Sequence, residues 1–292
     1  MNFRTDLALE RREYREKDKL DGVLSECKTV KGIKVTTIEI INSQGEKLLG
    51  KPEGKYITLE TDKLSKNSQA FSSACRVLCD ELRKLLPGQG TVLVAGLGND
   101  SITPDALGPK SLDKILATRH ISSELADSLG LGNLRSVAGI VPGVLGKTGI
   151  ETVEIISGVV KKISPCCVIV IDALAARKTE RLGTTVQISS AGVEPGSGVG
   201  NRRKSISRET LGVPVIAIGV PTVVDAVTMA MDVIGKAGAV LSEEYLSAHS
   251  NMVVTPKEID SLVDNASHLI AMGINTALQT NLTPQDIAEI IG

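Results

Sequence analysis

The sequence predicts an α/β fold organised around a mostly parallel β-sheet. Three continuous apolar runs, at residues 92–95, 166–171 and 214–220, are long enough for strands buried on both faces. Segments with helical spacing of apolar residues lie between them, and such alternation favours a parallel sheet covered by helices on both sides. With two Phe, three Tyr and no Trp, the core must be built mainly from Val, Ile, Leu and Ala.

Length and composition predict a single domain over residues 1–292. A chain of 292 residues, 42% hydrophobic, is long enough for one large core. The net charge of −1 gives no field that favours nucleic acid or membranes, so we expect no direct contact with either. No apolar segment reaches about 18 uninterrupted residues and no signal core begins the chain, which predicts a soluble, cytoplasmic protein.

The cysteines indicate no metal centre. All five lack the spacing of zinc sites, and they are expected to be reduced thiols that act as small hydrophobic residues. Neither a metal nor another cofactor is predicted.

The N-terminal part predicts a charged arm followed by a β extension. Residues 1–19 are highly charged and predict an exposed helix or arm. Residues 34–41 and 55–60 are predicted strands, joined through Gly and Pro turn signals. We therefore expect a hairpin or meander at the edge of the main sheet, within about residues 30–60. Apolar residues at three- and four-residue spacing predict a helix over 68–86.

The middle of the chain predicts two helices around a short strand. A helix is expected over 106–117, with Pro109 in its first turn, where proline is tolerated. Residues 136–141 predict a strand. Thr148 and Glu151 have the spacing of a capping box for a helix at 149–163.

The C-terminal part continues the alternation. Residues 184–188 predict a strand, and a helix is expected from Asp225 to about residue 236. Thr255, Pro256 and Glu258 have the pattern of an N-cap, a first-turn proline and an acidic third position. Further helices are expected from there to the end of the chain.

Acidic side chains follow two of the predicted buried strands. In an open α/β sheet, ligands and chemistry collect just past the carboxyl ends of the strands. The loop after residue 95 contains Asp100 and Asp105, and the strand at 166–171 stops on Asp172. The 67 residues between Asp105 and Asp172 leave room for two helical crossovers and a strand. If the two strands are neighbours in the sheet, the carboxylates meet.

Two adjacent carboxylates supply the chemistry for amide hydrolysis. They cannot both ionise easily, so one keeps a proton while the other stays charged. The charged group can deprotonate a water, and the protonated group can donate to a carbonyl oxygen or a leaving amine. Alternatively, each Asp caps the helix after its strand, or Asp100 replaces Asp105 in the pair. The sequence leaves open which group is the base.

Other site types find less support. The Gly-x-Gly at 96–98 lacks the third glycine of a dinucleotide site, and an anionic loop repels a pyrophosphate. None of the three His lies beside a strand-end motif, and GxSxG and HExxH are missing, which disfavours a serine triad or a zinc protease. The Gly- and Ser-rich loop at 189–201 contains Glu194. It is compatible with an anion cradle, a mobile surface loop or a substrate-contacting loop.

Several long motifs in register resemble one family. GLGNxxxTPDALGP, VPGVLGKTGIET, DALAAR, SSAGVEPGSGVGNRR and GVPTVVDA occur in this order. Together they resemble the spore germination proteases, endopeptidases of spore-forming Firmicutes that degrade small acid-soluble spore proteins. The resemblance runs from RTDLALE at the N-terminus to the C-terminal helices.

The resemblance implies a fold, an activity and an assembly. The fold would be the three-layer, phosphorylase/hydrolase-like α/β type that hydrogenase maturation proteases share. The catalytic pair would be Asp105 and Asp172, without a cofactor. The enzyme would be a homotetramer of the forespore and spore core, made as a self-processing zymogen. Processing would fall between Asp6 and Leu7 and remove a short propeptide of about residues 1–6.

The resemblance also implies cleavage after an acidic residue and before an apolar one. The acidic side chain needs a contact, and the candidate cations are Lys147, Arg177, Arg202 and Arg203. Further auxiliary or substrate-binding candidates are Asn99, Asp100, Thr103 and Glu194. Two alternatives remain: a metal-sensing endopeptidase of the hydrogenase-maturation type that binds nickel, which the missing strand-end His disfavours, and a non-enzymatic amide-binding module.

Overall fold

The computed structural model describes residues 3–15, 20–61, 68–128, 130–200, 203–236 and 252–291. Its strands form one nine-stranded sheet in the order β1-β2-β3-β7-β8-β6-β4-β5, with β9 paired to β8. The strands are β1 Val23–Val30, β2 Ile33–Ile40, β3 Gly54–Glu60, β4 Val92–Gly96, β5 Val137–Ile140, β6 Cys167–Ala176, β7 Thr185–Ser189, β8 Val215–Asp225 and β9 Val253–Val254.

The sheet is parallel at its centre and antiparallel at its N-terminal end. β8, β6, β4 and β5 run parallel to one another, and β6 lies directly beside β4. The strands β1, β2 and β3 extend the sheet in antiparallel pairs, and β7 joins this extension to β8. The predicted α/β class with a parallel centre is confirmed, and so is the assumption that the two acid-bearing strands are neighbours.

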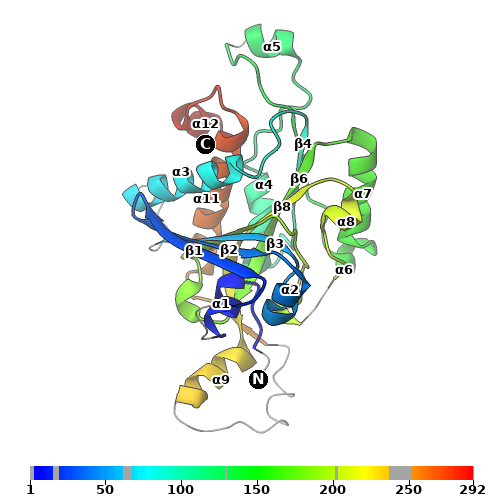
Figure 1. Ribbon diagram of the computed structural model, residues 1–292. Coiled ribbons are helices and arrows are strands. Elements are labelled where there is room, and N and C mark those ends of the chain that lie inside the picture. The colour runs from blue at the N-terminus through cyan, green and yellow to red at the C-terminus, as the bar shows by residue number, and fades with distance from the viewer. Residues whose placement is uncertain are drawn as a thin grey trace.

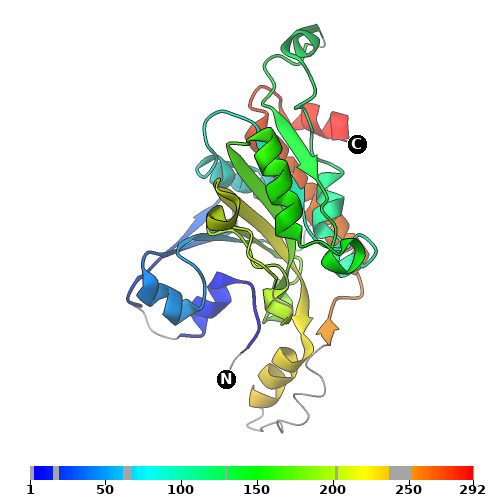
Figure 2. The ribbon, with the colours of Figure 1, turned by 90° about the vertical axis from the view of Figure 1, so that its right-hand side faces the viewer.

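Helices cover both faces of the parallel centre (Figures 1 and 2). One face packs against α3, α4 and α11 and holds the largest apolar cluster, while α7 and α8 lie on the other face over a second cluster. The result is a three-layer arrangement. The helices are α1 Ala8–Glu13, α2 Ser43–Leu49, α3 Gln69–Arg83, α4 Leu107–Leu112, α5 Ser123–Ser128, α6 Leu145–Thr148, α7 Thr152–Ile163, α8 Arg208–Leu211, α9 Ala226–Lys236, α11 Ile259–Leu278 and α12 Pro284–Ile291.

β6 and β8 are longer than predicted. The predicted strand ends at Asp172 and near residue 220 are wrong, because β6 and β8 stay paired as far as Ala176 and Val224. The register shifts after Leu174, which lies opposite Pro221, so the pair absorbs the proline through an irregularity. Asp172 therefore projects from within a strand.

Two predicted helix starts are also wrong. Thr148 ends α6 and its hydroxyl donates to the carbonyls of Val144 and Ile150, while α7 starts after Glu151 without a side-chain cap. The Thr255 hydroxyl donates to the carbonyl of Thr222 in β8, and α11 begins only at Ile259. The Thr148 oxygen accepts from the Ile150 N–H at 3.2 Å, which lies before α7 and not in its first turn. The helix predicted at 106–117 is shorter, because α4 ends at Leu112.

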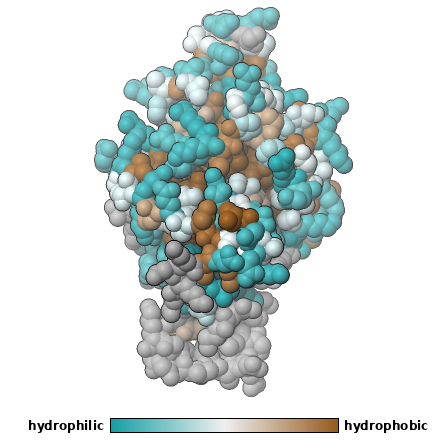
Figure 3. All heavy atoms as spheres, in the orientation of Figure 1, coloured by the Kyte–Doolittle hydropathy of each residue, from teal (hydrophilic) through white to brown (hydrophobic). Residues whose placement is uncertain are grey.

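None of the described helices is both long enough and apolar enough to cross a bilayer. On the face seen in Figure 3, apolar residues gather near the centre and hydrophilic residues surround them.

A close helix contact in the core gives a first prediction. Gly273 of α11 faces the fully buried Leu78 of α3, and a Cβ on Gly273 would lie 2.5 Å from Leu78 Cδ2. A helical Gly→Ala change ordinarily stabilises by about 0.5–1 kcal/mol. Here overpacking costs about 1–3 kcal/mol, so Gly273→Ala should lower the free energy of unfolding measured with denaturant.

The matched control is Gly158→Ala in α7, where an added Cβ meets nothing within 4 Å. This variant should raise the free energy of unfolding by about 0.5–1 kcal/mol. Equal stabilisation by both substitutions would show that Leu78 yields freely, against the prediction.

Candidate active site

Asp105 lies where the loop after β4 folds back on itself. It ends the short 3-10 helix η1 (Thr103–Asp105), and its Oδ2 accepts a hydrogen bond from the Asn99 N–H at 2.8 Å. The fold-back needs glycine at position 98, where φ is +109° and a Cβ would lie 2.0 Å from the Asp105 carbonyl oxygen. Gly98 thus also fixes the position of the acid.

Asp172 lies one residue beyond the pairing of β6 with β4. The last paired residues are Gly96 and Ile171, so Asp172 comes just where β4 turns away toward Asp105. The Asp172 side chain is buried, with 7% of its surface exposed. A buried carboxyl group with a second carboxyl nearby is a typical proton donor or acceptor in catalysis.

The two carboxyl groups line one hollow of about 430 Å³. Burial raises the pKa of Asp172 well above its usual range, and the nearby charges of Asp105 and Asp6 raise it further. Burial also raises the pKa of Asp105, although the hydrogen bond from the Asn99 N–H acts in the opposite direction. The environment therefore favours one shared proton held by Asp172.

Neither acid caps a helix. η1 and α4 lack a side-chain cap, and Asp172 belongs to a strand. Asp100 is separate from the pair, since its side chain is 70% exposed and forms an ion pair with Lys147 at 2.6 Å. The structure thus brings Asp105 and Asp172 together and leaves Asp100 and Lys147 outside the hollow.

The remaining predicted site residues lie either at one of two hollows or against the N-terminal segment. Asn99 lines the 430 Å³ hollow together with Arg203, and Thr103 begins η1 beside it. Glu194 lines a neighbouring hollow of about 560 Å³. The Arg177 guanidinium lies over the rings of Phe3 and Tyr14, at 4.6 and 5.2 Å from their centroids, so it holds the N-terminal segment. Arg202 falls outside the described residues.

Asp6, which the resemblance places before the expected processing bond, lies at the same hollow as the two acids. Its side chain lines both hollows, as Asp172 does. The Asp6 N–H donates to the Ala175 carbonyl at 2.9 Å, and the Ala175 N–H donates back to Asp6 Oδ2 at 2.9 Å. Asp6 Oδ1 accepts a bond from the Ser197 hydroxyl at 2.7 Å. Gln187, which contacts the same segment, gave no sequence signal, because it occupies an ordinary position of a strand.

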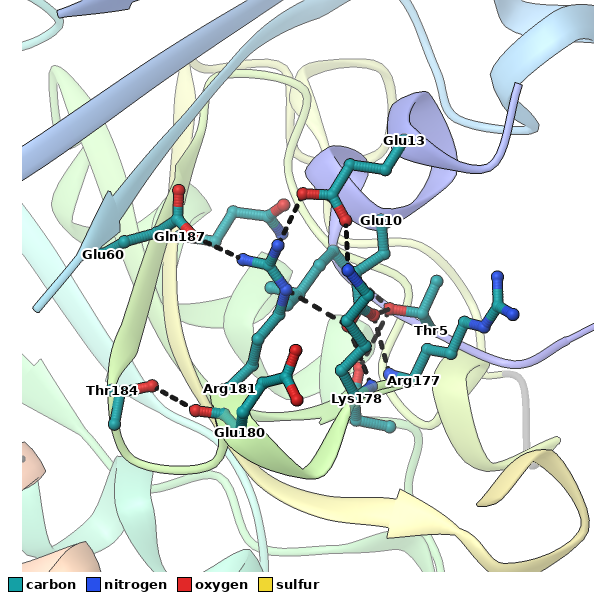
Figure 4. Close-up of polar contacts among 12 residues, drawn as sticks. Thr5, Glu10, Glu13, Glu60, Arg177, Lys178, Glu180, Arg181, Thr184 and Gln187 are labelled. Atoms are coloured by element: carbon teal, nitrogen blue, oxygen red, sulfur yellow. Dashed lines mark hydrogen bonds and ion pairs between the residues drawn. The ribbon is translucent and has the colours of Figure 1, made fainter. Parts of the chain in front are cut away.

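A buried ionic cluster anchors α1 beside the site (Figure 4). Glu10 accepts hydrogen bonds from the backbone N–H groups of Arg177 at 2.7 Å and Lys178 at 3.0 Å, and one from the Thr5 hydroxyl. The Arg181 guanidinium lies 3.4 Å from Glu10, 2.6 Å from Glu13 and 3.0 Å from Glu60. Burial raises the pKa of Glu10, while these hydrogen bonds and the Arg181 charge lower it.

Comparison with known proteins identifies the family. The family model described as germination protease matches residues 4–238. The chain belongs to the germination protease family. This assignment makes it a protease and confirms the resemblance found in the motifs.

The relatives match over nearly the full length. A germination protease of Caldanaerobacter subterraneus subsp. tengcongensis is 46% identical, with 100% of this chain and 98% of that protein covered. One from Clostridium perfringens is 43% identical, with 99% of both chains covered. One from Priestia megaterium is 37% identical, with 95% of this chain and 94% of that protein covered.

Among solved structures, the NiFe hydrogenase maturation protease HycI from Thermococcus kodakarensis KOD1 is similar. The match has a TM-score of 0.37 and 16% identity, and it covers 66% of this chain and 98% of that chain.

The anchor of α1 gives a second prediction. Arg181→Met in this germination protease removes the cation from the buried Glu10, which is 1% exposed. Leaving a buried charge unpaired costs about 3–5 kcal/mol, so denaturant unfolding should show a loss of that size. Because the pKa of Glu10 is raised, the loss should shrink in acidic buffer, where Glu10 takes up a proton.

Lys204→Met is the matched control, since Lys204 and Glu154 form an ion pair with both side chains more than half exposed. Its loss should stay below about 1 kcal/mol. A similar small loss for Arg181→Met would contradict the role given to the buried cluster.

Proposed function

We propose that this germination protease is an endopeptidase that initiates degradation of small acid-soluble spore proteins during germination, with Asp105 and Asp172 as an aspartic-type catalytic pair. The observation that carries the proposal is the shared hollow, in which two carboxyl groups have unequal environments. The membership in the germination protease family supports the biological setting.

The unequal environments support a division of roles. Asp172, which is the more deeply buried and has Asp105 and Asp6 beside it, keeps its proton and acts as the acid. Asp105, whose charged form is favoured by the Asn99 N–H, acts as the base. Asp105 removes a proton from water as the water oxygen attacks the peptide carbonyl, while Asp172 donates to the carbonyl oxygen. When the C–N bond breaks, the leaving nitrogen takes the proton from Asp105, and Asp172 takes back a proton from a diol oxygen as the carbonyl re-forms.

The N-terminus supports the proposal of a self-processing zymogen that cuts after an acidic residue and before an apolar one. Asp6 and Leu7 provide such a pair, and Asp6 lies beside Asp172. We propose that the cut falls between them and that the segment ending at Asp6 is a propeptide. The segment then lies at the site before it is cut.

The remaining features of the proposal concern setting and assembly. We assign the enzyme to the cytoplasm of the forespore and the spore core, as a homotetramer that binds protein substrates but neither nucleic acid nor membranes. Among the described residues, no group of three or more His, Cys, Asp and Glu has the arrangement of a metal site. Catalysis without a metal remains a prediction, which metal analysis of the pure protein tests.

Substitution of the acids tests the mechanism. Asp105→Asn and Asp172→Asn keep the side-chain shape but remove proton transfer, a contribution of about 10²- to 10⁴-fold to the rate. Each variant should lose cleavage of a purified small acid-soluble spore protein by at least that factor and should fail to process itself.

Asp113→Asn, at the exposed end of α4, serves as the control with unchanged activity. Asp100→Asn discriminates between the alternatives for the pair. Loss of activity in Asp100→Asn together with full activity in Asp105→Asn would assign the pair differently.

The pH dependence follows from the raised pKa values. Activity should fall at high pH as Asp172 loses its proton, and at low pH as Asp105 gains one, which a pH profile of kcat/KM measures. The folded pKa of Asp172 lies above its unfolded value, so the folded state binds the proton more tightly and stability decreases as pH rises between the two values. Asp172→Asn should flatten this decrease in the unfolding free energy. An unchanged slope would show that Asp172 does not hold the proton.

A further inference from the structure

The N-terminal segment lies against the acid pair like a bound peptide. Before α1 begins, Arg4 forms an ion pair with the buried Asp225 at 3.0 Å, and the Arg4 N–H donates to the Thr228 hydroxyl at 3.2 Å. Two residues later, Asp6 lines both hollows together with Asp172. The chain therefore occupies the space next to its own candidate catalytic groups.

A cradle of uncharged donors receives the Asp6 carboxylate. Among the described residues, the donors to its two oxygens are the Ala175 N–H and the Ser197 hydroxyl. Gly198 forms the wall, since a Cβ on it would lie 2.2 Å from Asp6 Oδ2. A carboxylate accepts charge-assisted bonds from such donors strongly, whereas an amide side chain in its place turns an NH₂ group toward one of them.

Gln187 forms two hydrogen bonds to backbone atoms of the segment. Its Nε2 donates to the Asp6 carbonyl at 3.0 Å, and its Oε1 accepts from the Ala8 N–H at 2.8 Å. That carbonyl belongs to the peptide bond between Asp6 and Leu7. Gln187 and Asp172 are both in register with Gly219, which lies between them in the sheet. Gln187 therefore binds the Asp6–Leu7 peptide group from one side of Gly219, and Asp172 lies on the other side of Gly219.

An apolar site follows the cradle. The Leu7 side chain is fully buried and clusters with Leu174, Ala176 and Val224. The polar cradle therefore fits an acidic side chain, and the adjacent apolar site fits an apolar side chain that follows it. Gln187 binds the carbonyl between the two residues.

We propose that these contacts are the substrate-recognition sites of the protease. The cradle of Ala175, Ser197 and Gly198 binds the acidic side chain of an extended peptide, the Leu7 site binds the next, apolar side chain, and Gln187 positions the carbonyl between them. The ligand is an acidic–apolar peptide segment, and the chain's own residues 4–8 occupy the sites in this structure. The inference rests on the proposed endopeptidase function but concerns binding alone.

The test measures binding by fluorescence anisotropy. The receptor is the full-length protein carrying Asp6→Ala and Leu7→Ala, which remove both resident side chains from their sites. The probes are a labelled peptide NFRTDLALER, copied from this chain, and the same peptide with Asn in place of Asp. We expect the Asp peptide to bind about ten- to a hundredfold more tightly, as charged hydrogen bonds contribute.

Variants of this receptor separate the roles. Gly198→Ala should abolish the preference for the Asp peptide, and Ser197→Ala, which adds no atoms, should reduce it. Gly158→Ala, with open space around its Cβ, should leave it unchanged. Gln187→Ala should weaken both peptides by the same factor, because it reads backbone atoms that they share.

The outcomes are decisive for binding independently of catalysis. Equal affinity for the two peptides, no binding of either, or an Asp preference that survives both Gly198→Ala and Ser197→Ala would overturn the proposal. Adding Asp172→Asn to the receptor removes any cleavage of the probe. Failure of the catalytic proposal would therefore appear only in the protein-digestion assay, and failure of the recognition sites only in the binding assay.

Discussion

The parallel adjacency of β4 and β6 is the constraint on which the site depends. Gly96, the last residue of β4, pairs with Ile171, and β6 continues beyond this pair with Asp172. The chain leaving β4 folds back through Gly98, so Asp105 meets the side chain that β4 no longer covers. Any change in the register of these strands would separate the acids. The mixed sheet and its two helical layers fix the position of Asp105 relative to Asp172.

Sequence reasoning succeeded where a general rule of α/β sheets applied. Buried strands followed by acids predicted Asp105 and Asp172 at one edge, and the strands are neighbours. It failed where the hydroxyl groups predicted to cap helices had other partners. Thr148 bonds locally to Val144 and Ile150, and Thr255 bonds across 33 positions to the Thr222 carbonyl in β8. β1 and α2 were not predicted, because the exposed pattern of β1 shows no buried face and α2 lies among turn signals.

Asp6 and Gln187 show a different limit of prediction. A single Asp in a charged N-terminal segment and a single Gln in a strand have no distinctive spacing, and only the folded chain brings them together across 181 positions. The N-terminal segment also depends on distant charges. Glu10 tolerates burial because two backbone N–H groups and Arg181 surround it, and these groups come from the chain just after β6. The strand that carries Asp172 thus also leads into the anchor of α1.

The covalent attachment of residues 4–8 has a kinetic consequence. The attached segment rebinds to the recognition sites by a first-order process, so dilution of the protein does not lower their occupancy. An incoming chain must compete with a local concentration that short flexible linkers typically set in the millimolar range. Severing the tether changes the order of the rebinding reaction, and the released piece diffuses away at the low concentration of any free peptide. Occupancy is then governed by bulk concentration rather than by chain connectivity.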